Sequence, residues 1–171
     1  MPFRILPDLA LRLRAWMTPA PASAAKAWQA AAGGASHAFW MFAHPVHLAL
    51  GRDHFVLVEP APLIASSEEA ASILQSLNHH FSAQGLRFYL NGNQWFLGLD
   101  KDPGIRTSLL KKALNQDVSP YLPRGEGALE WAKLTNEMQM LLFSHPANAA
   151  REVRGELPIN SLWFDGLSAT E

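Results

Sequence analysis

The sequence predicts an α+β fold, in which an antiparallel sheet of about four to five strands has helices packed on one face. Strand-like apolar runs occur in pairs, and a short turn sequence separates the members of each pair. Segments with a helical spacing of apolar residues lie between and after these pairs. The expected order is therefore β-β-α-β-β-α-α-β, and 171 residues with 49% hydrophobic composition suit one globular domain.

An amphipathic helix is expected at residues 3–17, where apolar residues recur on one helical face. We expect this face to pack against the protein or a partner rather than to lie on a membrane. Residues 18–36 are rich in Ala, Pro, Gly and Ser, which is typical of a linker, with one helical turn around Trp28. The predicted organisation is an N-terminal helix and linker at 1–36, followed by a single α+β domain at 37–171.

The first strand pair and the first helix of the domain have clear signals. Residues 46–50 and 54–59 are apolar, β-prone runs, and the glycine-containing turn between them predicts an antiparallel hairpin. A helix is expected next, because Ser66 and Glu69 are spaced as a capping box. Its apolar stripe continues towards Gly85, a residue type that often ends helices.

The second strand pair consists of residues 86–90 and 94–99. The Asn-Gly-Asn sequence between them tolerates the positive φ angles of tight hairpin turns, so another antiparallel pair is expected. A short helix is predicted at 107–115, where leucines are spaced for burial and two lysines face outward.

The longest helical stripe runs through residues 129–145. Pro146 cannot donate a backbone hydrogen bond inside a helix, so it is expected to begin a second, short helix that continues through residues 147–153. Gly155 is suited to end that helix. A strand is then predicted at residues 160–164.

A dense motif of polar residues, HPxNxxRxxxGxxPxNxxWxxG, spans residues 145–166, and the sequence NEMQMLL precedes it at 136–142. Together they resemble archaeal-type cofactor-independent phosphoglycerate mutases. They are more similar to bacterial proteins distantly related to those mutases, which carry the labels phosphoglycerate mutase or RpfE-type regulatory protein. The resemblance reaches back to about Trp40. It implies that the α+β domain corresponds to the domain that is inserted into the phosphatase-like core of the mutases and covers their active site.

The resemblance also implies what a mutase requires, namely two divalent metal ions held by Asp and His ligands and a serine that is transiently phosphorylated. The mutase core supplies these groups and has an Asp-Gly pair near its start, whereas the only Asp-Gly pair here is Asp165-Gly166. We therefore expect a non-catalytic regulatory or interaction protein without a cofactor. The alternative is a mutase-like isomerase or a protein that binds a small phosphorylated metabolite, and a divalent metal is expected only in that case.

Five motif residues are candidates for ligand binding, while no residue is expected to be catalytic. Asn148 and Asn160 would satisfy backbone groups between the kinked helix and its strand. Alternatively, Arg151 and the amides at the start of the second helix would hold a small anion. The candidates are His145, Asn148, Arg151, Asn160 and Trp163.

Histidines are the only side chains that prompt a metal hypothesis in the first hairpin. His44, His47 and His54 would hold zinc if the hairpin brought all three imidazoles to one side. Ordinary polar or half-buried histidines are the favoured interpretation, because His44 precedes a proline and the other two fall on different strands. No metal site is therefore predicted.

Composition limits the classes of partner. A net charge of -1 gives no general attraction to nucleic acid, and the absence of cysteine excludes disulfides. No apolar run approaches the roughly 18 residues that a membrane span requires, so a cytoplasmic location is expected. Trp16, Trp28 and Trp40 lie in or beside the N-terminal segment, and tryptophan is enriched at interfaces. A protein partner or a homo-oligomer is therefore expected.

Overall fold

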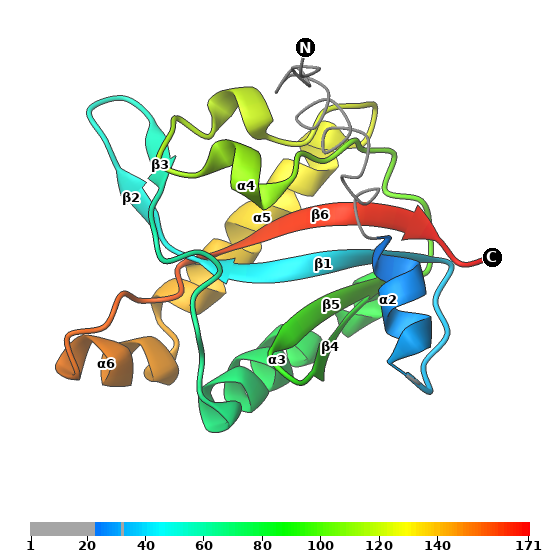
Figure 1. Ribbon diagram of the computed structural model, residues 1–171, viewed down its shortest axis with the longest axis horizontal. Coiled ribbons are helices and arrows are strands. Elements are labelled where there is room, and N and C mark those ends of the chain that lie inside the picture. Colours follow the sequence, from blue (N-terminus) through cyan, green and yellow to red (C-terminus); the bar gives the residue numbers. More distant parts are fainter. Residues whose placement is uncertain (1–22, 32) are drawn as a thin grey trace, which may run out of the picture.

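The structure is a computed structural model that describes residues 23–31 and 33–171. The helix expected at 3–17 lies outside the described residues. Figure 1 labels the elements, and the predicted α+β class is confirmed. The helices are α2 (Ala24–Ala30), α3 (Ser67–Phe81), α4 (Leu110–Ala113), α5 (Ala128–Phe143) and α6 (Pro146–Val153). The strands are β1 (Phe39–Val46), β2 (Leu48–Leu50), β3 (Phe55–Leu57), β4 (Leu86–Asn91), β5 (Gln94–Leu99) and β6 (Ser161–Ala169).

The main sheet is antiparallel and has the strand order β4-β5-β1-β6. Its central strand β1 pairs with β5 through Trp40 and Gly98, and with β6 through Ala43 and Phe164. The hairpin expected at 46–59 is present, but β2 and β3 form a separate two-stranded sheet.

Strand β1 was not among the predicted strands, although it lies at the middle of the sheet. Its sequence, FWMFAHPV, is buried on both faces, so the apolar and polar residues do not alternate. Pro45 also opposes a strand assignment, because proline cannot donate a ladder hydrogen bond. Strand β1 therefore lacks the alternation of apolar and polar residues that marks a half-buried strand.

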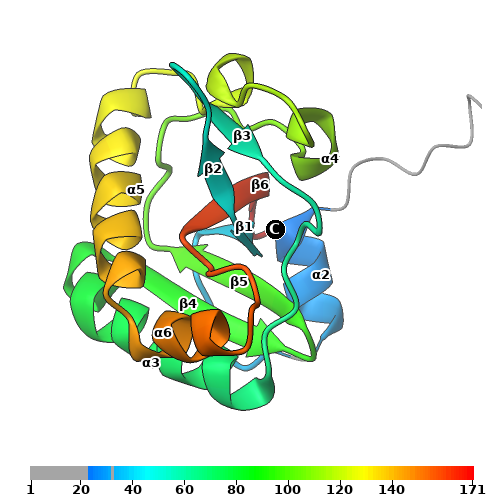
Figure 2. The same ribbon diagram turned by 90° about the vertical axis from the view of Figure 1, so that its left-hand side faces the viewer.

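The two faces of the sheet are covered by different helices (Figures 1 and 2). Met41 and Ala43 of β1 pack in the core that includes side chains of α3 and α5. Trp40 and Phe42, which alternate with them, pack with Trp28 of α2. The larger helices thus occupy one face, as expected, while α2 covers part of the other.

Helix α2 occupies a segment that was expected to be a linker with one helical turn. Its seven residues begin after Ser23, whose side chain accepts a hydrogen bond from the Lys26 amide. The Trp28 ring stacks on Trp40 with 4.7 Å between centroids. The Trp28 indole also donates to the Ala35 carbonyl at 3.0 Å. The contact between Trp28 and Trp40 attaches this segment to the sheet. The alanine-rich sequence around Trp28 does not predict this contact.

The predicted turn and cap residues adopt the required conformations. Ser66 and Glu69 form both hydrogen bonds of the capping box, at 3.1 and 2.9 Å. Gly85 has a φ of 77° just after the 3-10 turn that follows α3, and Gly92 has a φ of 59° in the β4–β5 turn. Across the part of the chain that the structure describes, none of the helices is both long enough and apolar enough to span a bilayer.

Candidate functional site

His145 stands at the kink between α5 and α6, where it caps the N-terminus of α6. Its Nδ1 accepts a hydrogen bond from the Ala147 amide at 3.2 Å, and its Nε2 lies 3.1 Å from the Ser76 hydroxyl. Since Nδ1 accepts, the neutral ring carries its proton on Nε2 and donates it to Ser76. His145 is 6% exposed, and both of its ring nitrogens bond within the protein.

Asn148 and Asn160 join chain segments through their side-chain amides. The Asn148 amide donates to the carbonyls of Leu142 and Ile159, both at 2.8 Å, and its oxygen accepts from the Ile159 amide at 2.7 Å. Asn160 pairs in the same way with the amide and carbonyl of Leu48, at 2.8 and 2.9 Å. These bonds provide the backbone satisfaction that the sequence predicted for both residues.

Arg151 is almost completely buried, with a side chain that is 4% exposed. It donates to the carbonyls of Leu157 and Ile64, at 2.8 and 3.1 Å, and to Glu69 at 3.0 Å. Glu156 lies 3.5 Å from the same guanidinium. The carboxylates of Glu69 and Glu156 therefore compensate the positive charge of Arg151, which would otherwise be available to bind an anion.

Glu69 also accepts a hydrogen bond from Arg154, so it links two arginines. Burial raises the pKa of Glu69, but the Ser66 amide, the Arg154 hydrogen bond and the two guanidinium charges lower it more. The net pKa lies below the ordinary value of a glutamate. Glu69 is therefore held in its ionised form between α3 and α6.

Trp163 lies apart from the other four candidates. Its indole donates to the Ser108 carbonyl at 2.8 Å, and its ring packs in a cluster with residues of β3 and α4. It borders a small cavity of about 50 Å³, whereas His145 lines a different, open cavity with Ser76 and His79. The structure thus places Asn148 and Arg151 on α6 and His145 at its N-cap, while Asn160 and Trp163 bond to other parts of the chain.

The three histidines of the metal hypothesis have three different partners. His44 lies 2.9 Å from Asp165, His47 lies 2.9 Å from the Pro158 carbonyl, and His54 lies 2.8 Å from Asp53. Within residues 23–31 and 33–171, no group of three or more His, Asp or Glu side chains is placed to hold a metal ion. The first hairpin therefore does not bring these imidazoles to one side.

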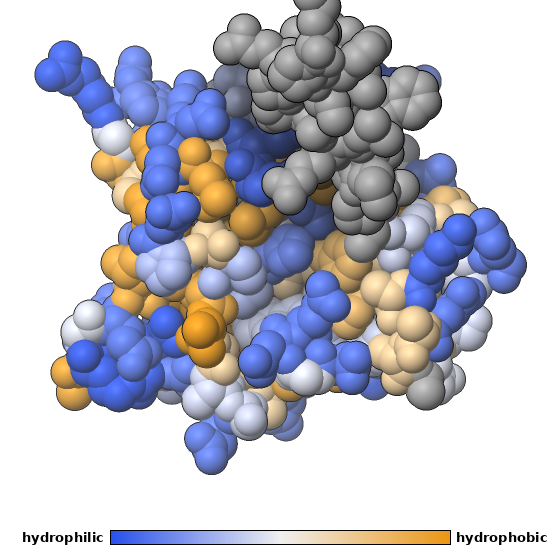
Figure 3. Space-filling model, viewed as in Figure 1, coloured by the Kyte–Doolittle hydropathy of each residue, from blue (hydrophilic) through white to orange (hydrophobic). Residues whose placement is uncertain are grey.

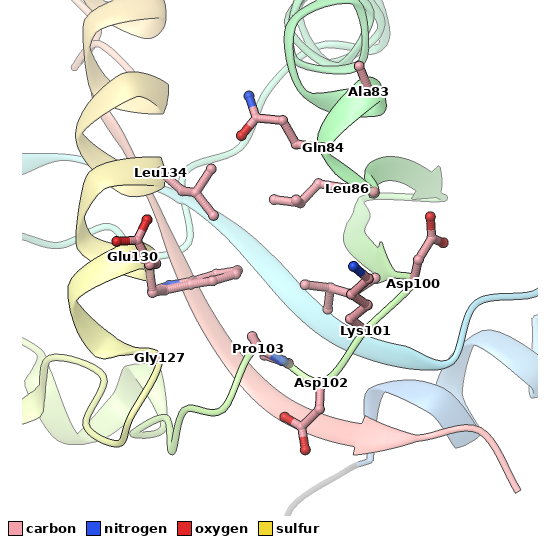
Figure 4. Close-up of a pocket in the computed structure, with 13 residues that line it drawn as sticks. Ala83, Gln84, Leu86, Asp100, Lys101, Asp102, Pro103, Gly127, Glu130 and Leu134 are labelled. Atoms are coloured by element: carbon pink, nitrogen blue, oxygen red, sulfur yellow. The ribbon is translucent and has the colours of Figure 1, made fainter.

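A cavity of about 420 Å³, called the end cavity here, opens where β4 begins and β5 ends, beside the first turns of α5. The side chains of Leu86 and Leu134 face each other across it in Figure 4. The sequence gives no signal for this cavity, because three segments that are distant in the chain form its walls. The lining residues are Ala83, Gln84, Gly85, Leu86, Leu99, Asp100, Lys101, Asp102, Pro103, Gly127, Glu130, Trp131 and Leu134.

Charged side chains surround the opening of the end cavity. The carboxylates of Asp100, Asp102 and Glu130 point away from one another rather than converging on its centre (Figure 4). Lys101 is the one basic residue in the lining. The arrangement can therefore hold an apolar group inside and a positive charge at the edge.

Asp100 also belongs to a chain of hydrogen bonds for which the sequence gives no signal. It lies 2.9 Å from Nδ1 of His37, whose Nε2 lies 2.7 Å from the Tyr89 hydroxyl. Burial and, to a smaller extent, the Asp100 charge raise the pKa of Tyr89 despite the opposing effect of Arg87, so its hydroxyl keeps its proton. A tyrosine hydroxyl can donate or accept, so the chain persists whether His37 is neutral or charged.

Comparisons with known proteins support one relationship. The chain is 27% identical over 104 residues to the 2,3-bisphosphoglycerate-independent phosphoglycerate mutase of Methanosarcina mazei, which covers 59% of this chain and 26% of the relative. It is 39% identical over 51 residues to a probable mutase of the same name from Geobacter sulfurreducens, which covers 30% of this chain and 13% of the relative. The chain thus spans about a quarter or less of the length of these curated relatives.

A solved structure shares the fold. The cofactor-independent phosphoglycerate mutase from Thermoplasma acidophilum matches with a TM-score of 0.56 and 17% identity, over 84% of this chain and 41% of that chain. No family model matches the chain. The resemblance found in the sequence is therefore confirmed as a distant and partial relationship to archaeal-type cofactor-independent phosphoglycerate mutases.

Proposed function

We propose that this chain is a non-catalytic regulatory or interaction protein built on a domain related to phosphoglycerate mutase. It acts in the cytoplasm and binds a protein partner or a second copy of itself. One observation carries the proposal: the polar groups of the candidate ligand-binding motif bond to the chain itself. Asn148 and Asn160 pair with backbone groups, and two carboxylates neutralise Arg151.

Exposed apolar side chains give the proposal further support. On α5, Met140 and Phe143 are 73% and 86% exposed. Leu50 and Phe55, which face each other across the β2–β3 pair, are also exposed. Figure 3 shows hydrophobic residues gathered over this hairpin. A partner that covers these apolar side chains removes their surface from water, which favours association.

The alternative is a mutase-like isomerase or a protein that binds a small phosphorylated metabolite. The name of the curated relatives, which specifies phosphoglycerate mutase, favours it. A divalent metal would then be required to neutralise the transferred phosphoryl group.

A mutase assay separates the non-catalytic proposal from the mutase-like isomerase. The full chain is incubated with 3-phosphoglycerate and manganese, and phosphorus NMR follows the formation of 2-phosphoglycerate. We expect no conversion beyond that of a mock purification from the same host. Conversion that increases in proportion to the amount of chain added would overturn the non-catalytic proposal.

A further inference from the structure

We propose that the end cavity docks a basic segment of a partner protein, which inserts one apolar side chain between α5 and the ends of β4 and β5. This inference rests on the proposed interaction function and names the surface and the chemistry of the partner. Its basis is the combination of an apolar wall with an acidic edge.

The inner wall of the cavity is apolar. Leu86 and Leu99 come from the sheet, Leu134 from α5, and Pro103 from the loop that follows β5. Leu86 and Leu99 are only 5% and 4% exposed, so they form a fixed floor rather than a mobile surface. Burial of an apolar side chain in the cavity contributes a favourable free energy of about 25 cal/mol for each Å² of apolar area removed from water.

The edge of the cavity is acidic. The lining contains three carboxylates, Asp100, Asp102 and Glu130, and one basic residue, Lys101, so its formal net charge is -2. Lys133, which is outside the lining, forms an exposed ion pair with Glu130. In each carboxylate, one oxygen has a hydrogen-bond partner. The partner is His37 for Asp100, the Gly104 amide for Asp102 and the Lys133 ammonium for Glu130. In the part of the chain that the structure describes, no hydrogen bond reaches the second oxygen of any of the three. The edge therefore presents oriented acceptors for arginine or lysine.

The same geometry opposes a small phosphorylated ligand. An anion would meet a net negative edge, and Lys101 is the one lining residue whose positive charge would attract its phosphate. Small-molecule sites also bring polar groups together inside the pocket, whereas here the carboxylates diverge around it (Figure 4). An apolar centre with a charged edge is the anatomy of a protein interface.

Fluorescence anisotropy with a labelled probe peptide tests the inference on the full chain. The probe has a central leucine between arginines, and its matched control replaces every arginine with glutamate. We expect saturable binding of the arginine probe and at least about tenfold weaker binding of the control. The affinity should fall when the NaCl concentration is raised from about 50 mM to about 300 mM, because salt screens exposed charges. Equal binding of both peptides overturns the inference.

Two variants locate the binding surface. Glu130→Lys should weaken binding of the arginine probe about fivefold, and Leu134→Ala should do the same by shortening the wall. Glu152→Lys makes the same charge change at an exposed position of α6, outside the cavity, and should leave affinity within about twofold. Thermal unfolding checks that each variant is folded.

The outcomes separate this inference from the function on which it rests. If the arginine probe binds folded Glu130→Lys, Leu134→Ala and Glu152→Lys equally well, the end cavity is not the docking site, while the interaction function stands. Mutase activity in the phosphorus NMR assay would instead overturn the function itself. Loss of binding in the two cavity variants alone supports the inference.

Discussion

At the scale of single residues, three asparagines perform the same task. Each side-chain amide pairs with both the N–H and the C=O of one residue elsewhere in the chain, which is how a neighbouring strand would bond. The asparagine side chain thus makes the two hydrogen bonds that a neighbouring strand would make with that residue. The pairs are Asn78 with Phe88, Asn148 with Ile159, and Asn160 with Leu48.

Asn148→Ala tests the most buried of these pairs. Asn148 is 3% exposed, and its removal leaves the carbonyl and the amide of Ile159 without their partner, while the Leu142 carbonyl keeps its hydrogen bond from the His145 amide. We expect the free energy of unfolding to fall by about 3 kcal/mol in urea titrations. Asn136→Ala, at an exposed position of α5, is the control and should change it by less than about 0.5 kcal/mol. A loss below about 1 kcal/mol for Asn148→Ala would contradict this account.

The sequence predicts part of this residue-scale chemistry. Asn148 and Asn160 stand beside a kink and a proline, so unpaired backbone groups could be expected near them. Asn78 gives no such signal, because it lies within the periodic stretch of α3. The chain from Asp100 through His37 to Tyr89 joins residues up to 63 positions apart and depends on strand register. Sequence periodicity does not contain that information.

At the scale of elements, Glu69 connects the start of α3 to α6. One residue completes the capping box with Ser66 and also binds Arg151 and Arg154. The capping box follows from local spacing, so it was predicted. The two ion pairs bridge 82 and 85 positions, so they required the folded structure.

The contribution of Glu69 to stability should depend on pH. The folded-state pKa of Glu69 lies below its ordinary value of 4.5, so its stabilising effect is complete above that value and is lost as the pH falls towards the folded-state pKa. Glu69→Gln should therefore lower the free energy of unfolding by about 2 kcal/mol at pH 7. The difference from the unmodified chain should shrink below about pH 4.5.

Urea titrations from about pH 7 to about pH 3 measure this difference. Glu68→Gln removes a neighbouring carboxylate that forms no ion pair among the described residues, and it should cost less than about 0.5 kcal/mol at pH 7. A Glu69→Gln difference that stays constant or grows towards acid would show that the arginine pairs do not lower the pKa of Glu69.

Elements with local signals were predicted well, and elements defined by burial were not. The cap of α3, the β4–β5 turn and the break at Pro146 each depend on residues close in sequence. Strand β1 and helix α2 depend on what covers them. The residue type predicts that Trp28 lies at an interface, and the structure shows it packed on Trp40 within the chain.

At the scale of the whole molecule, the predicted motif and the end cavity have different roles. The motif residues hold the junctions among α5, α6, β2 and β6. The end cavity lies between the opposite, N-terminal end of α5 and the sheet. In this chain, the motif that resembles the mutases thus joins chain segments within the fold, while the cavity with an apolar wall and charged edge lies elsewhere.

An amide NMR titration of the full chain tests the central claim most directly, because one spectrum reports on both surfaces. We predict that the arginine probe peptide shifts the signals of Gly85, Lys101 and Gly127 saturably, and that 3-phosphoglycerate with magnesium shifts none in this way. Saturable shifts of Asn148 and Arg151 with 3-phosphoglycerate, and none with the peptide, would contradict the account and establish the motif as a metabolite site.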